Sequence, residues 1–197
     1  MAVVSIKNKL RRGNLLAGND PYIPTDFESI ATVSVGSGGA ANVEFTSIPG
    51  TFTHLQVRGI TLGSAAASGS MLYQFNSDTS SNYNSHLLGG NGSVATSHFS
   101  GGGSETSGRF YGYYDNLANN NYPLVFVMDI LDYANTNKYK TVKTLSGMDK
   151  NGNNYGEIFL YSSLWRSTTA VSTLKLFCGG QNLGQYTQFA LYGIRSA

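Results

Sequence analysis

The stretch THLQVRGITL, residues 53–62, decides the fold class because its side chains alternate in character from one residue to the next. Successive side chains of a β-strand point to opposite faces of its sheet. One face would carry Leu55, Val57, Gly59 and Thr61, and the other would carry His54, Gln56, Arg58 and Ile60. The stretch QYTQFALYGI, residues 185–194, alternates in the same way. Both stretches therefore predict half-buried strands.

Runs of this kind recur along the chain, rich in Val, Ile, Phe, Tyr and Thr and followed by Gly, Asn or Ser. We expect strands within residues 27–35, 42–48, 52–62, 70–76, 109–114, 122–133, 138–149, 156–165, 172–178 and 185–194. The segment LVFVMDIL, residues 124–131, is nearly continuous in apolar residues and predicts a central strand covered on both faces. The pattern predicts an all-β antiparallel β-sandwich, with an eight-stranded jelly roll carrying extra short strands as the first choice.

The segments between these runs are expected to be turns and loops. Residues 89–108, GGNGSVATSHFSGGGSETSG, are rich in glycine and serine and predict a long exposed loop. The segment GSGGAA, residues 36–41, formally fits a dinucleotide-binding pattern. That site needs a helix directly afterwards, whereas a strand is expected here, so the segment is interpreted as a turn.

The first residues differ from the rest, and we expect residues 1–26 to form an extended N-terminal arm and residues 27–197 a single sandwich domain. Pro21 and Pro24 disfavour a helix there. The arm is interpreted as a segment that docks on a partner, with a solvated tail as the alternative. The residues expected to dock are Lys7, Lys9, Arg11, Arg12 and Tyr22. A basic cluster this short, at one terminus, argues against a nucleic-acid partner.

The composition favours a surface that contacts protein or glycan. Charged residues make up only 12% of the chain, about half the usual share, so Ser, Thr, Asn and Gly must keep the surface polar. A small neutral domain is the alternative. The single cysteine, Cys178, cannot form an internal disulfide and is expected to be a small buried hydrophobe. No stretch has the length of a signal peptide or of a membrane span, so we expect cytoplasmic synthesis and no membrane insertion.

The segment QFNSDTSSNYNSHLLGGNGS, residues 74–93, raises the question of a metal or sugar site around Asp78. An oxygen-ligand calcium loop needs several carboxylates, and here no glutamate follows Asp78 before Glu105. Asn and Asp residues favour turns because they bond their own backbone. Turn chemistry is the preferred interpretation, with a calcium site and a glycan contact as alternatives.

No catalytic constellation emerges from the sequence. The segment DKNGNNYGEIF, residues 149–159, resembles a calcium loop, but its Asn151-Gly152 pair between two strands favours a hairpin. The three histidines, His54, His86 and His98, could join a Ser-His-Asp set only by chance. We therefore expect no catalytic residue, metal or cofactor, and a protein that is not an enzyme.

Aromatic and polar residues offer contact sites instead. The segment RFYGYYDN, residues 109–116, combines tyrosines with an arginine, which are enriched at interfaces and can stack on sugars. An ordinary sandwich strand is the alternative. The residues expected to contact a glycan or an interface are Asp78, Asn82, Tyr83, His86, Arg109, Tyr111 and Tyr113.

Several longer segments resemble a group of tailed-phage virion structural proteins, common in marine and cyanobacterial phages. These are FESIATVSVGSGGAANVEFTSIPGTFTHLQVRGI (27–60), YQFNSDTSSNYNSHLLGGNGS (73–93), DILDYANTNKYKTVKTLSG (129–147), SSLWRSTTAVSTLKLF (162–177) and YTQFALYGI (186–194). The resemblance covers roughly residues 27–195 and implies a virion component without catalysis.

The expected function is that of a non-enzymatic phage virion structural protein, a capsid decoration or a head or tail fibre component. It would be synthesised in the bacterial host cytoplasm and dock through its arm on capsid, portal or tail proteins. A homo-oligomer is expected, with a trimer favoured because virion appendages commonly use cyclic symmetry. The alternative is a host-glycan-binding module of a tail fibre or appendage.

Overall fold

The computed structural model describes residues 26–64, 69–112, 122–149 and 156–195. The described residues form twelve strands and no helix, so none of them lies in a helix able to cross a membrane. The strands are β1 (Phe27–Ser34), β2 (Asn42–Phe45), β3 (His54–Thr61), β4 (Ser70–Phe75), β5 (Tyr83–Gly90), β6 (Ala95–Glu105), β7 (Gly108–Tyr111), β8 (Leu124–Leu131), β9 (Lys140–Met148), β10 (Glu157–Trp165), β11 (Leu174–Gly179) and β12 (Gln188–Ile194).

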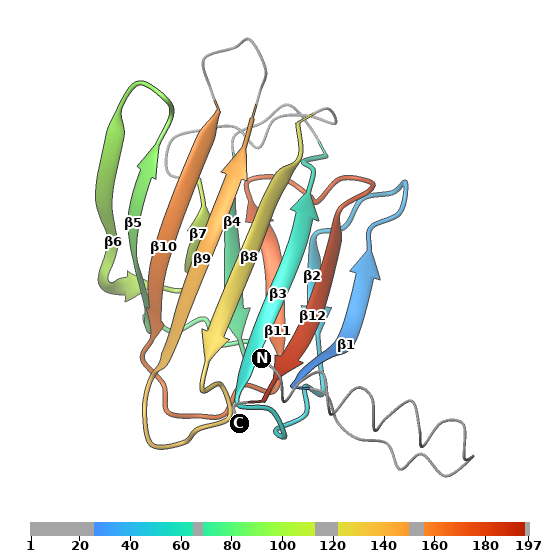
Figure 1. The fold of residues 1–197 in the computed structure, drawn as a ribbon, viewed down its shortest axis with the longest axis vertical. Helices are drawn as coiled ribbons and strands as arrows, with labels where there is room; N and C mark the ends of the chain where they lie inside the picture. The colour runs from blue at the N-terminus through green and yellow to red at the C-terminus, as the bar shows by residue number, and fades with distance from the viewer. Residues whose placement is uncertain (1–25, 65–68, 113–121, 150–155, 196–197) are drawn as a thin grey trace, which may run out of the picture.

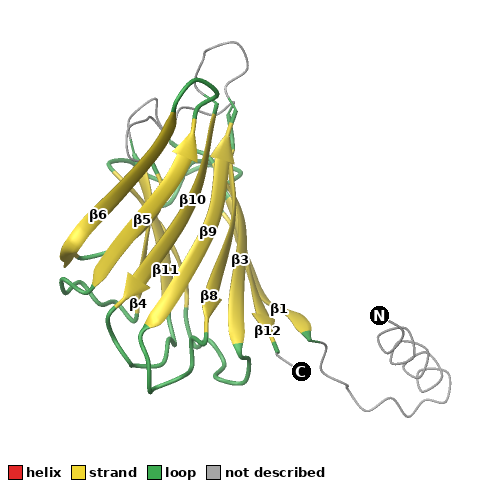
Figure 2. Cartoon of the chain, turned by 60° about the vertical axis from the view of Figure 1, so that its left-hand side comes forward, coloured by secondary structure: helices red, strands yellow, loops and turns green. Residues whose placement is uncertain are grey.

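The strands form two sheets that pack face to face. The larger sheet has the order β1-β12-β3-β8-β9-β10-β5-β6 and faces the viewer in Figure 1. The smaller sheet, β2-β11-β4-β7, lies behind it, and Figure 2 shows the two layers from another side. All neighbouring strands run antiparallel. The predicted antiparallel β-sandwich is confirmed.

Four of the strand pairings are nested within one another. β1 pairs with β12, β2 with β11, β3 with β8, and β4 with β7. The strands outside this nest are the pairs β5–β6 and β9–β10, and both extend the larger sheet beyond β8. The larger sheet is therefore wider than the smaller one.

The core between the sheets is aromatic, as the alternating sequence predicts. In β3, Leu55 and Val57 are buried, whereas Arg58 and Ile60 are exposed. The rings of Phe75 and Trp165 lie 5.3 Å apart between the layers. Cys178 is also buried, and burial raises the pKa of its thiol to about 11.

Two expectations about short segments are confirmed. The segment 36–41 forms a turn, with Gly39 at a φ of 68°, and β2 follows it directly instead of a helix. β9 and β10 pair from Met148 and Glu157 onward, as the hairpin prediction requires. The turn residues of that hairpin, 150–155, lie outside the described residues.

The expected long loop over residues 89–108 is wrong. These residues belong largely to β5 and β6, which pair with each other from Gly90 and Ala95. β5 also pairs with β10 along eight residues, from Tyr83 opposite Trp165 to Gly90 opposite Ile158. Pairing with a neighbouring strand outweighs the weak strand propensity of glycine and serine.

The expectation that residues 124–131 are covered on both faces is also wrong. The segment forms β8, fourth in the larger sheet and therefore central, as predicted. Its side chains alternate in burial, however, and Val125 and Val127 are 50% and 38% exposed. The smaller sheet covers only the inner face of the larger one, and none of the described strands covers the centre of its outer face.

Candidate functional site

Asp78 holds a turn. Its carboxylate accepts hydrogen bonds from Trp165 Nε1 at 2.7 Å, the Ser80 backbone N–H at 2.8 Å and Asn82 Nδ2 at 2.9 Å. Asn76 and Ser77, just before it, have positive φ angles of 51° and 54°. Among the described residues there is no group of three or more His, Cys, Asp or Glu side chains that could hold a metal. The geometry is that of the preferred turn interpretation.

These hydrogen bonds determine the acidity of Asp78. Burial alone would raise its pKa, but the hydrogen bonds from Asn82, Trp165 and Ser80 outweigh burial and lower the pKa to about 2. The carboxylate is therefore charged throughout the neutral range and fixed by its donors, which favours a structural role.

We expect Asp78→Asn to lower the free energy of unfolding by about 1.5 kcal/mol at neutral pH. Both carboxylate oxygens accept hydrogen bonds, whereas an amide has only one acceptor oxygen. In either orientation, the amide NH₂ group would therefore point at the N–H of Trp165 or of Ser80. The folded-state pKa lies below the ordinary value of 3.8, so the contribution is present above that value and is lost as pH falls through about 2. Urea denaturation followed by circular dichroism at several pH values measures this. Asp26→Asn, at an exposed residue, is the control and should change little. A difference independent of pH down to about 2 would contradict the role of the charge.

The structure separates the other predicted contact residues. Tyr83 and Tyr111 have no exposed surface, so neither offers its side chain to a glycan. Tyr83 instead accepts a hydrogen bond from the Phe75 backbone N–H at 3.0 Å. Arg109 is half-buried and donates to the carbonyl of Gly112 at 2.9 Å and to the hydroxyl of Ser70.

His86 is the predicted contact residue that lies exposed on the outer face of the larger sheet. Its ring centroid lies 4.5 Å from that of Phe99, which is itself exposed, and the two rings are tilted by 35° to each other. Several predicted contacts cannot be placed, because Lys7, Lys9, Arg11, Arg12, Tyr22 and Tyr113 lie outside the described residues. The predicted residues thus do not form one site.

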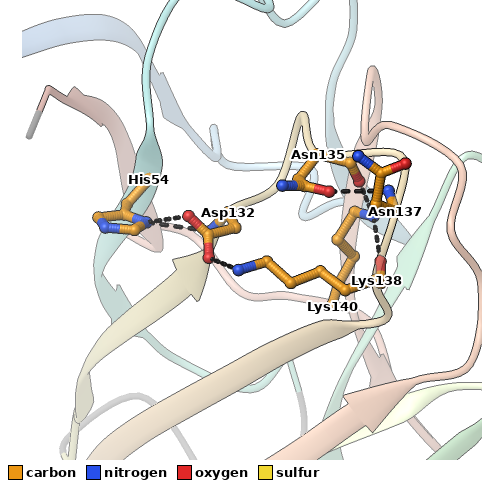
Figure 3. A network of polar contacts seen from close by, with 6 residues as sticks. All are labelled: His54, Asp132, Asn135, Asn137, Lys138 and Lys140. Carbon is orange, nitrogen blue, oxygen red and sulfur yellow. Dashed lines mark hydrogen bonds and ion pairs between the residues drawn. The ribbon is translucent and has the colours of Figure 1, made fainter.

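A polar network lies where β8 passes into β9 (Figure 3). The Asp132 carboxylate forms an ion pair with Lys138, and the Asp132 backbone N–H donates to His54 Nδ1 at 2.9 Å. The hydrogen bond from Lys138 is the main cause of the lowered pKa of Asp132. In a hydrolytic triad, Nδ1–H donates to the carboxylate. Here Nδ1 is an acceptor, so the pair joins the loop to β3 and does not have triad geometry.

Lys140 is the fully buried member of this network, with no exposed surface. Its ammonium group donates to the backbone carbonyls of Asn135 at 2.5 Å, Lys138 at 3.0 Å and Thr168 at 3.2 Å. Burial lowers the pKa of Lys140, and the negative charge of Asp132 acts in the opposite direction. One cation therefore joins two loops, which makes the network a structural brace.

The prominent surface feature is a group of exposed apolar side chains on the outer face of the larger sheet. We name it the apolar patch, and it consists of Ile60, Leu88, Val125, Val127, Leu145, Ile158 and Leu160. Strand register places these residues side by side. Leu145 lies opposite both Val127 and Leu160, and Leu160 also lies opposite Leu88. Val125 lies opposite Ile60 in the same way.

A groove runs through the patch where the sheet carries glycine. Gly147 lies between Val125 and Ile158 on the neighbouring strands, and Gly90 lies on the other side of Ile158. The groove has a volume of about 830 Å³ and is mostly apolar, with Asp149 and Glu157 at one end. It can receive an apolar side chain, and none of the described residues lining it forms a catalytic constellation.

Sequence reasoning missed the patch, although a signal was present. In β8 and β10, consecutive residues that point to opposite faces of the sheet are both apolar, for example Val125 and Phe126, or Ile158 and Phe159. For residues 124–131 this signal predicts cover on both faces, whereas it arises from an exposed apolar face. No family model, no curated protein and no solved structure matches the chain.

Proposed function

We propose that the chain is a non-enzymatic structural protein of a tailed-phage virion, a capsid decoration or a head or tail fibre component. The observation that carries the proposal is the apolar patch. Its size is at the upper end of the largest apolar patches on soluble monomers, and such patches are often contact sites. The described surface thus offers an area for assembly, while its histidine–aspartate pair has the geometry of a brace.

We infer further that the sandwich is a jelly roll extended by two strand pairs. A jelly roll is an eight-stranded double sheet of two Greek keys. The nested pairing of β1 with β12, β2 with β11, β3 with β8 and β4 with β7 supports this topology. Jelly rolls recur in viral capsid and lectin domains. This is support by analogy of architecture, and the contact surface carries the functional argument.

The proposal includes docking through the arm, residues 1–26, on capsid, portal or tail proteins, and location in the virion. Its support is the short basic cluster from Lys7 to Arg12. Binding of a host glycan is the second candidate function. The exposed pair of His86 and Phe99 favours it, because aromatic rings can stack on sugars. A glycan array of host envelope sugars, probed with the purified chain, separates the two functions.

Immunogold electron microscopy of purified particles tests the virion role. With antibody raised against the full chain, we expect gold on particles of the phage that encodes it, because a structural component remains bound through purification. Gold over the head would indicate a decoration or head fibre, and gold at the tail would indicate a tail component. Particles that lack the gene are the control. A chain abundant in the infected lysate but absent from purified particles would contradict the proposal.

A further inference from the structure

We propose that the apolar patch is the contact surface for a second copy of the same chain, packed face to face about a two-fold axis. This inference rests on the assembly role proposed above and names the partner of that surface. A two-fold contact uses the same residues on both copies, so the surface must be complementary to itself in size, shape and charge.

The size of the patch is sufficient. The exposed surface of its residues adds up to roughly 600 Å². This area is at the upper end of the range for the largest apolar patches on soluble monomers. Two such patches would together bury about 1,200 Å² before their rims are added, which reaches the lower bound of stable protein interfaces. The face can therefore sustain a specific contact by itself.

The shape of the patch combines a ridge and a trough in one row. Across the sheet, Val125, Gly147, Ile158 and Gly90 follow one another on neighbouring strands. Ile158, 58% exposed, projects between two positions that have no side chain. A two-fold axis near Leu145 would allow Ile158 of each copy to enter the groove over Gly147 of the other.

The charges beside the patch are of both signs, and they include Arg58, which is exposed on β3 opposite Val127. On the outer face, Asp129 and Lys143 lie opposite each other on β8 and β9. Asp129 also accepts a hydrogen bond from Gln56 Nε2 at 2.8 Å. Mixed signs on this face limit the repulsion between two identical faces.

The first experiment measures the mass of the full chain in solution. Light scattering coupled to size-exclusion chromatography, over a series of concentrations, should give twice the 21.1 kDa of one chain. Leu145→Lys, at the patch centre, should weaken self-association about tenfold or more because it buries a charge in the contact. Tyr139→Lys is the matched control, since Tyr139 is equally exposed but outside the patch. Circular dichroism verifies that both variants are folded.

A second experiment does not depend on a disruptive variant. Leu145→Cys should be cross-linked to its own copy by a short bis-maleimide reagent, because residues near a two-fold axis face their own copies across sheets about 10 Å apart. The native Cys178 is buried and should not compete. Tyr139→Cys should remain monomeric on a denaturing gel. Equal cross-linking of both variants, or of neither, would overturn the proposal.

The outcomes distinguish this inference from the proposed function. A monomer at all concentrations, or a trimer unaffected by Leu145→Lys, would overturn the two-fold contact, and the trimer would agree with the sequence-based expectation instead. Cross-linking of this face to a different virion protein in purified particles would also overturn it, while leaving the virion role standing. A patch-dependent dimer that is absent from particles would support the contact and contradict the virion role.

Discussion

Replacing Lys140 by methionine is expected to lower the free energy of unfolding by about 3 kcal/mol, although the two side chains have similar length. The ammonium group is buried and donates to the carbonyls of Asn135, Lys138 and Thr168. A thioether donates to none of them, so three carbonyls lose a charged partner at once. Urea denaturation measures the loss, with the fluorescence of the single tryptophan, buried Trp165, as the probe.

The control is the same substitution two residues earlier. Lys138 is exposed and forms its ion pair with Asp132 at the surface, where such pairs contribute less than about 1 kcal/mol. Lys138→Met should therefore cost much less than Lys140→Met. Equal losses of unfolding free energy for the two variants would contradict this prediction. They would show that the hydrogen bonds from Lys140 to the three carbonyls contribute no more than the surface ion pair of Lys138 with Asp132.

The arrangement of strands could be predicted from the sequence where side chains alternate. β3 and β12 follow the expected pattern because each has one face in the core, so a strand period of two is visible in the sequence. β5 and β6 could not be predicted, because glycine and serine carry no such period. The pairing of β5 with β10 is a contact between distant segments that local propensity does not encode.

The candidate site was less accessible to sequence reasoning. The role of Asp78 as a turn residue follows from local chemistry and could be predicted, whereas its bond to Trp165 spans 87 residues and could not. The apolar patch depends on which strands lie beside each other and on which face the smaller sheet covers. Leu145 and Leu160, for example, become neighbours only through the pairing of β9 with β10.

The strongest test of the core is Gly59→Ala, which should lower the free energy of unfolding by about 3 kcal/mol. A Cβ atom at this position would lie 2.3 Å from Phe126 Cε1 and 2.6 Å from Phe189 Cδ1. Neither ring can easily move, because Phe126 packs at 4.7 Å against Phe110 and at 5.6 Å against Phe189. Urea denaturation followed by circular dichroism measures the loss.

Two further variants identify the cause of this loss. Gly36→Ala, in the turn after β1 of the same sheet, is the control, because no atom lies within 4 Å of its added Cβ, and it should change stability by less than about 0.5 kcal/mol. If crowding by the ring is the cause, Phe126→Leu should make room, and the double variant should lose less than the sum of the two single losses. Additive losses would contradict steric crowding and would attribute the effect of Gly59→Ala to the backbone.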